Sequence, residues 1–242
     1  MGLIKSAIGD GILTSMWVFS VPLLVITSAA VSSFAGVEPK SLAAVFITVN
    51  VAAAFVLFFS TIGSLLGGAS FNPTTTVSLY AAGLKPDASL FSIAARFPIQ
   101  AAGGVLGAKA IGKFLPAKFR HVLGGPSLKV DLHTGAIAEA ALSFVLCLAL
   151  LSIMVKGPRN YLVKVWLLAV VTVGLIFTGG KFTGPSMNPA NAYGWAYVNN
   201  RHNNWQLFYV YCISPLLGAI LAARVFKLLF KPSSPTPKDK KE

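Results

Sequence analysis

The sequence predicts an all-α membrane protein with six transmembrane helices and two re-entrant half-helices in an inverted repeat. Hydrophobic residues make up 55% of the 242 positions and charged residues only 11%, whereas a soluble domain carries about a quarter charged residues. Six apolar segments are each long enough to cross a hydrocarbon core about 30 Å thick, which takes about 20 helical residues. Two further apolar segments are too short to cross it, and they share a sequence motif.

Hydrophilic connectors separate the candidate spans. The predicted spans are Ile8–Val31, Leu42–Leu66, Leu90–Ile111, Thr134–Val155, Leu162–Thr178 and Gln206–Phe230. The first apolar segment follows Lys5, as in a signal peptide, but its length and the presence of Asp10 favour a retained span. Residues 231–242 are rich in Pro, Ser and Lys, which predicts a disordered basic tail.

The two short segments repeat the pattern Gly-x-Ser-x-Asn-Pro, at Gly68–Pro73 and Gly184–Pro189. Asn is among the best helix N-caps, and Pro suits the first helical position because its missing N–H is not needed there. Short helices are therefore expected over Thr74–Ala82 and Ala190–Asn199. At 1.5 Å per residue each is about 15 Å long, or half a bilayer.

The repeated motif divides the chain into two halves, residues 1–120 and 121–230. Each half has three spans and a carboxylate in its opening helix, Asp10 or Glu139. An odd number of spans makes the second half enter from the opposite side, so the two half-helices can meet N-terminus to N-terminus at the midplane. Irregular backbone at that depth is tolerated around a polar cavity or inside protein. The repeat therefore predicts a pore or a binding site.

Composition argues against several other functions. The net charge of +13 comes largely from Lys and Arg beside apolar segments or in the tail, which favours topology and lipid contacts over nucleic-acid binding. Cys147 and Cys212 lie in apolar runs, and His121, His133 and His202 are scattered, so no metal site is expected. We also predict no cofactor and no enzymatic activity, because no nucleophile–base pair or phosphate-binding loop is evident.

Several motifs resemble the major intrinsic protein family, the aquaporins and glycerol channels. The resemblance covers about Ile8 to Phe230 and rests on Thr183–Ala190, Glu139, Gln100 and Pro215–Gly218. The first motif, Asn72-Pro73-Thr74, has Thr where the family usually has Ala, and Asp10 stands where Glu is usual. The altered motif, the short N-terminus and the basicity are most similar to the plant small basic intrinsic proteins.

The resemblance implies a homotetramer with one pore per subunit and both termini in the cytosol. The distribution of Lys and Arg supports this orientation only in part, because the Lys113–His133 connector is basic although it would lie outside the cytosol. Lys238 and Lys240 resemble a dilysine signal for return to the endoplasmic reticulum, which would place the protein in that membrane. A solvated basic tail is the alternative interpretation.

The expected pore constriction comprises Asn72, Pro73 and Thr74 from the first motif and Asn188, Pro189 and Ala190 from the second. Each Asn caps a half-helix whose N-terminus carries about half a positive charge. Its amide can donate to a passing water oxygen, while the two positive helix ends oppose cations and protons. The Thr74 hydroxyl either bonds the local backbone or narrows the lumen.

The resemblance implies an outer selectivity filter at Ala52, Ile176, Pro185 and Asn191. Three residues after the second Asn the family nearly always has Arg, whereas this chain has Asn191. A filter without Arg lacks a charged donor, which predicts a less polar constriction with altered selectivity.

Carboxylates inside spans are costly and usually functional. Asp10 and Glu139 could relay protons, but the resemblance favours a role in holding the re-entrant loops through hydrogen bonds. Arg96 either snorkels to the interface or pairs with one of these carboxylates. Gly63-x-x-x-Gly67 and Gly103-x-x-x-Gly107 fit close helix packing.

The predicted function is a passive channel in the lipid bilayer for water or a similarly small neutral solute. The alternatives are a channel for hydrogen peroxide or another small uncharged solute with poor water flux, a secondary transporter, and a non-conducting structural protein. Transporters usually place ionisable groups at the midplane, where this sequence has two neutral amides.

Overall fold

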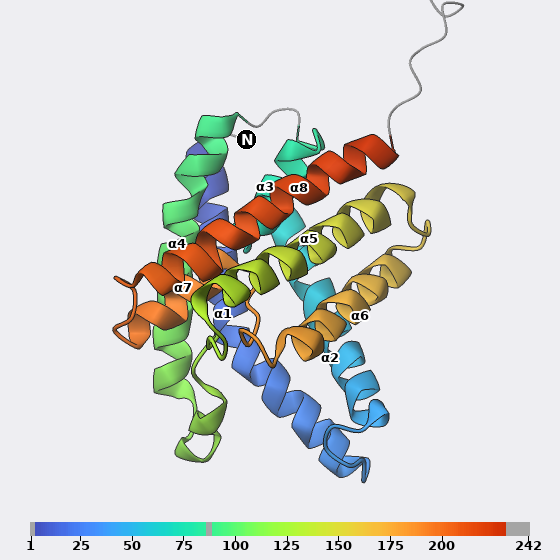
Figure 1. Cartoon of the computed structure of the whole chain (residues 1–242). Helices are drawn as coiled ribbons and strands as arrows, with labels where there is room; N and C mark the ends of the chain where they lie inside the picture. The colour runs from blue at the N-terminus through green and yellow to red at the C-terminus, as the bar shows by residue number, and fades with distance from the viewer. Residues whose placement is uncertain (1–2, 86–88, 231–242) are drawn as a thin grey trace, which may run out of the picture.

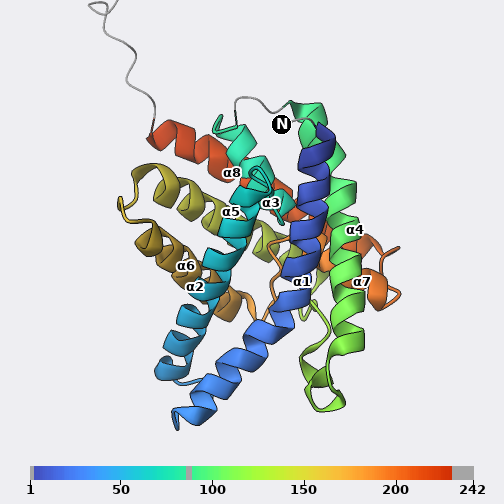
Figure 2. The same cartoon turned by 180° about the vertical axis from the view of Figure 1, so that it is seen from behind.

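The computed structural model describes residues 3–85 and 89–230, so Lys238 and Lys240 lie outside the described residues. All of its regular elements are helices (Figures 1 and 2). The start of α1 and the end of α8 lie at the same end of the molecule in both views. The elements are α1 (Leu3–Phe34), α2 (Leu42–Leu65), α3 (Pro73–Ala81), α4 (Leu90–Phe114), η1 (Ala117–Val122), α5 (Leu132–Lys156), α6 (Tyr161–Gly179), α7 (Pro189–Val198), η2 (Leu207–Ile213) and α8 (Ser214–Leu229).

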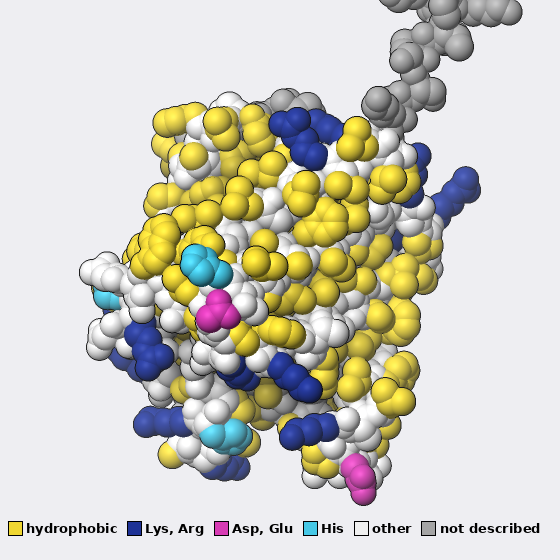
Figure 3. All heavy atoms as spheres, in the orientation of Figure 1, with side chains coloured by type: hydrophobic (Ala, Val, Ile, Leu, Met, Phe, Trp, Pro, Cys, Tyr) yellow, Lys and Arg dark blue, Asp and Glu magenta, His cyan; other side chains and the backbone are white. Residues whose placement is uncertain are grey.

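Six of these helical segments are long and apolar enough to cross a membrane, which confirms the predicted fold class. Their bounds lie within a few residues of the predicted spans, except that α1 begins five residues earlier than expected, at Leu3. The half-helices α3 and α7 begin at Pro73 and Pro189, one residue before the predicted starts. Figure 3 shows hydrophobic side chains across the broad middle of one face, with Lys and Arg mostly towards its edges.

The sixth span contains an irregularity that the sequence analysis did not predict. Its first part, η2, is a π-helix, in which the Ser214 N–H bonds to the Tyr209 carbonyl five residues earlier. The Ser214 hydroxyl donates to the same carbonyl at 2.7 Å. The next residue, Pro215, has no N–H to continue the α-helical ladder. The proline therefore accounts for a wider turn at the junction with α8.

Equivalent helices of the two halves pack in the same way. The most extensive contacts join α1 to α4 in the first half and α5 to α8 in the second. Glycines allow this approach: a β-carbon at Gly103 would overlap the Gly11 carbonyl oxygen, and one at Gly218 would overlap that of Ala140. Gly107 meets α1 one turn further on. Close packing was predicted for Gly67 too, but Gly67 lies beyond the end of α2, in a turn with φ of 71°.

Each half-helix packs against the third span of the other half, α3 against α8 and α7 against α4. The α4–α7 contact is the closer one, because Gly104 faces Ala190 and Gly194 and the gap leaves no room for a β-carbon at either glycine. These contacts hold the two half-helix N-termini opposite each other in the interior.

Candidate pore

The two Asn-Pro pairs begin the half-helices as the sequence predicts. Asn72 is extended, with φ of −138°, and its Oδ1 accepts the Thr74 N–H at 2.9 Å. Asn188 is also extended, with φ of −146°, and its Oδ1 accepts the N–H groups of Ala190 at 3.1 Å and Asn191 at 3.3 Å. Both Asn residues are thus N-caps, with the following Pro at the first helical position.

The amide nitrogens of the same two residues link the halves of the chain. Asn72 Nδ2 donates to the Met187 carbonyl oxygen at 3.0 Å, and Asn188 Nδ2 donates to the Phe71 carbonyl oxygen at 3.0 Å. Each amide therefore bonds to the residue immediately before the other Asn. An amide nitrogen carries two N–H groups, so one N–H of each Asn is left over for another acceptor. Asn72 is 7% exposed and Asn188 is 4% exposed.

Met187 adopts a left-handed backbone conformation, with φ of 49°, which is uncommon for a residue other than Gly. Its N–H donates to Glu139 Oε2 at 3.1 Å, and its carbonyl accepts from Asn72 at 3.0 Å. The unfavourable conformation is therefore offset by hydrogen bonds at both ends of the residue.

Asp10 lies behind the first re-entrant loop and is fully buried. Its Oδ1 accepts the Ser70 N–H at 2.8 Å. Arg96 from α4 forms a bidentate ion pair with it, with Nε 2.6 Å from Oδ2 and Nη2 2.5 Å from Oδ1. Gln100, one turn further along α4, donates its Nε2 to Asp10 Oδ2 at 3.0 Å and to the Ser70 carbonyl at 2.9 Å. Arg96 and Gln100 thus fix both the carboxylate and the loop.

Glu139 lies in the matching place behind the second loop and is also fully buried. Its Oε1 accepts the Thr183 hydroxyl at 2.8 Å and the Ser186 N–H at 3.1 Å, while Oε2 accepts the Met187 N–H at 3.1 Å. These donors are all neutral, so the two carboxylates meet the re-entrant loops with different partners.

Lys85 lies near the first carboxylate, in the loop after α3, and is half-buried. Burial lowers the pKa of its ammonium group below the ordinary value; the nearby Arg96 charge lowers that pKa further, and Asp10 opposes both effects.

Thr74 is fully buried, and its hydroxyl has no hydrogen-bond partner among the described residues. Of the two possibilities left open by the sequence, the local backbone bond is absent from the structure. Thr76, two residues later and equally buried, does make such a bond, from its hydroxyl to the Asn72 carbonyl at 3.1 Å.

The four residues predicted for the outer filter occupy different environments. Ala52 is buried between α2 and α6 with Val49 and Val173. Ile176, on α6, is 46% exposed. Pro185 and Asn191 belong to the second loop and its half-helix, and both are half-buried.

The Asn191 side chain folds back onto its own loop. Its Nδ2 donates to the Ser186 hydroxyl oxygen at 3.2 Å, and that hydroxyl donates to the Asn188 carbonyl at 2.8 Å. The Oδ1 of Asn191 is buried and has no partner among the described residues. The site where the family usually has a cation therefore has an unpaired neutral acceptor.

Sequence reasoning missed the serines and aromatics that support the loops. Ser70 and Ser186 each bond the carbonyl of the Asn two residues later, at 3.2 Å and 2.8 Å. Both serines occupy the same place in the repeated motif, and this repetition could have indicated their shared role. Trp17 stacks on Phe71 at 4.3 Å between ring centroids. Because Phe71 carries the carbonyl that binds Asn188, α1 helps to place the second amide.

Comparisons with known proteins find a matching family model and similar sequences. A family model described as Major intrinsic protein matches residues 2–226. A protein from Oryza sativa subsp. japonica named Aquaporin SIP1-1 is 52% identical over 240 residues, which cover 98% of each chain. A protein of the same name from Arabidopsis thaliana is 45% identical, covering 100% of this chain and 99% of its own.

The fold also resembles a solved structure. The X-ray structure of the aquaglyceroporin from Plasmodium falciparum matches with a TM-score of 0.68 and 17% sequence identity, covering 93% of this chain and 96% of that chain. At this level of identity, the similarity concerns the fold alone.

Proposed function

Because the chain belongs to the major intrinsic protein family, it is a passive channel for water or a similarly small neutral solute, and we propose that Asn72 and Asn188 form its constriction. Their reciprocal bonds to Met187 and Phe71 support this proposal, since these bonds fix both amides next to two half-helix N-termini. In each amide the remaining N–H can donate to a solute oxygen. A water molecule held in this way would have its hydrogens directed away from the constriction.

The two half-helix ends supply the proposed exclusion of ions. Each carries about half a positive charge, and the low dielectric of the protein interior screens it only weakly. A cation or hydronium between them would be repelled from both sides, whereas a neutral solute would not. In this scheme, transport needs no ionisable group. The proposed channel differs in this respect from an ion-coupled transporter.

Asn191 favours a second candidate solute, hydrogen peroxide. Its side chain carries no charge, is shorter than that of Arg and folds back onto the Ser186 hydroxyl, whereas an Arg at this place would add a charged donor. Hydrogen peroxide is neutral like water but slightly larger, so a filter without the long Arg side chain suits it. The channel would then pass peroxide better than a filter with Arg would.

We further propose that Asp10 and Glu139 hold the re-entrant loops in place and do not relay protons. Their bonds to the backbone N–H groups of Ser70, Ser186 and Met187 support this role. A homotetramer with cytosolic termini in the endoplasmic reticulum membrane remains the proposed assembly and location.

Stopped-flow light scattering on proteoliposomes tests the constriction with the variant Asn188→Asp. Asp retains the helix cap but replaces the Nδ2 donor with a carboxylate oxygen, so the bond to the Phe71 carbonyl is lost and a negative charge enters the pore. We expect a loss of at least tenfold in water or peroxide flux. The matched control is Asn160→Asp, because Asn160 is also an N-cap, of α6, but is exposed and outside the constriction.

Flux through the control but not through Asn188→Asp would support the constriction. Equal flux through both variants would contradict it. If the wild-type protein passes peroxide but little water, the second candidate solute is correct.

A further inference from the structure

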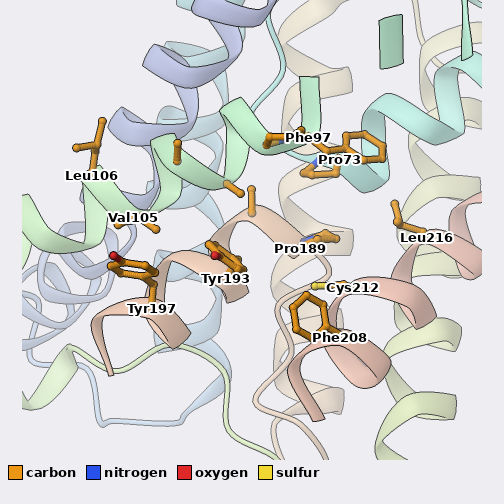
Figure 4. A pocket seen from close by; sticks show the side chains of 14 residues that line it. Pro73, Phe97, Val105, Leu106, Pro189, Tyr193, Tyr197, Phe208, Cys212 and Leu216 are labelled. Atoms are coloured by element: carbon orange, nitrogen blue, oxygen red, sulfur yellow. The ribbon is translucent and has the colours of Figure 1, made fainter. Parts of the chain in front are cut away.

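A lateral groove of about 710 Å³ runs along α4 on the outside of the molecule, between α4 and the η2–α8 span. Its walls include Phe97, Val105 and Leu106 of α4, with Phe208 and Cys212 of η2 opposite them (Figure 4). The floor is formed by Tyr193 of α7 and by the prolines that begin the half-helices, Pro73 and Pro189. Almost all of the lining atoms are apolar.

The groove is separate from the proposed pore. It is lined by Pro73 and Pro189 but by neither Asn72 nor Asn188, so the half-helix N-termini divide it from the constriction. Its rim is exposed on the molecular surface, where Leu106 is 63% exposed and Phe208 is 41% exposed. Both residues belong to membrane-spanning helices, so the groove opens towards lipid.

The groove lies over the middle of the α4 span. It extends along α4 from Phe97 to Leu106, whereas α4 itself runs from Leu90 to Phe114. The seven residues from Leu106 to Lys113 span about 10 Å at 1.5 Å each, and half of a hydrocarbon core is about 15 Å thick. An acyl chain whose headgroup lies at Lys113 would therefore reach the groove with its terminal part.

Positive charge lies at the outer end of the groove. Lys109 and Lys113 follow Ala102 and Leu106 on the same face of α4, at helical spacings of three and four residues. Both lysines are exposed, and Lys113 is in the last turn of the helix. The Lys109 ammonium lies 4.9 Å from the centroid of the Tyr197 ring, which lines the groove. The ammonium groups thus lie where a chain in the groove would end in its headgroup.

We propose that the lateral groove binds one acyl chain of an anionic phospholipid, with the phosphate group at Lys109 and Lys113. The apolar walls exclude a polar ligand, and an apolar groove over the middle of the span, with positive charge towards one end of α4, fits a phospholipid. A basic residue near a membrane surface contributes about fivefold to the binding of an anionic lipid. Removal of both lysine charges should therefore reduce the preference for anionic over zwitterionic lipid by about 25-fold.

Native mass spectrometry of the detergent-purified protein tests the proposal, with phosphatidylglycerol and phosphatidylcholine added in equal amounts. Ala102→Trp fills the groove from its exposed wall, and Ala54→Trp is its control on an exposed position of α2 outside the groove. Lys109→Gln/Lys113→Gln removes the charge, and Lys40→Gln/Lys118→Gln removes two exposed charges that do not line the groove as its control. Elution volume and thermal midpoint establish that each variant is folded.

We expect the wild type and both controls to retain phosphatidylglycerol in preference to phosphatidylcholine. Ala102→Trp should lose at least tenfold in bound lipid, and the double Gln variant should retain lipid without preference. Unchanged lipid binding by Ala102→Trp would overturn the proposal, because the lipid would then bind elsewhere. A smaller assembly for Ala102→Trp would also overturn it, because the groove would then be a contact between subunits.

Discussion

The buried ion pair between Asp10 and Arg96 offers a sharp test of how the first re-entrant loop is held. Three variants are needed: Asp10→Asn, Arg96→Met and the two combined. Asp10→Asn leaves a guanidinium group that is 7% exposed without its counter-ion, and Arg96→Met leaves a carboxylate that is fully buried. The combined variant leaves neither charge, and the Asn side-chain oxygen can still accept the Ser70 N–H.

The magnitudes follow from the burial of both groups. Removing one member of a buried ion pair costs about 3–5 kcal/mol, because the remaining charge has no compensation. Removing both charges is often close to neutral, and we expect a cost of about 1 kcal/mol here from the weaker bonds to Gln100 and Ser70. The two single changes should therefore be strongly non-additive, with a coupling energy of about 3 kcal/mol or more.

The assay is equilibrium unfolding in mixed detergent micelles with increasing sodium dodecyl sulfate, followed by circular dichroism. Lys113→Met is the matched control, because Lys113 is a cation on the same helix but is exposed. Its free energy of unfolding should change by no more than about 0.5 kcal/mol. Solute flux measured in parallel should fall in both single variants and recover in part in the combined one.

Additive changes in the free energy of unfolding for the two single variants would refute this reasoning. If each single change costs less than about 1 kcal/mol and the combined variant costs their sum, the ion pair is effectively solvated. The loop would then depend on Gln100 and on the backbone bonds alone.

Three further predictions concern the half-helices and the filter. Thr74→Val should stabilise the protein by about 1 kcal/mol, because it replaces a buried hydroxyl without a partner, whereas Thr76→Val should destabilise it by about 1 kcal/mol in the same assay. Gly104→Ala should lower the free energy of unfolding by about 1–3 kcal/mol, because its β-carbon would overlap the Ala190 carbonyl. Gly112→Ala should raise the free energy of unfolding by up to about 1 kcal/mol, because no atom lies near its β-carbon. Asn191→Arg should lower the ratio of peroxide to water flux in proteoliposomes, and an unchanged ratio would show that Asn191 does not contribute to selectivity.

The fold and the half-helix starts at the two Asn-Pro pairs could be predicted largely from local signals. Span length follows from the thickness of the bilayer, and the half-helix starts follow from the Asn-Pro pairs, since capping chemistry is confined to neighbouring residues. The structure moves each half-helix start by one residue only, to Pro73 and Pro189. The position of Asn72 opposite Asn188 followed from the inverted repeat.

Contacts between distant residues could not be predicted in this way. Arg96 and Asp10 are 86 residues apart, and their pairing depends on how α4 is rotated against α1. The spacing of Arg96 and Gln100 by one helical turn was a partial signal, because it places two polar side chains on one face of an apolar helix. The bonds of Asn72 and Asn188 to opposite loop carbonyls left no sequence signal, because any residue supplies a carbonyl.

The first and second loops share a motif but are held by different chemistry, and the difference bears on selectivity. Glu139 reaches three neutral donors of its loop, whereas the shorter Asp10 reaches one and fills its remaining positions with Arg96 and Gln100. The chain thus places an arginine behind the first loop, where Asp10 binds it, and has none at Asn191. With the guanidinium paired and buried, we expect the half-helix N-termini to be the main source of positive potential in the proposed pore. Ion exclusion should therefore depend more on Asn72 and Asn188 in this channel than in one whose filter carries a cation.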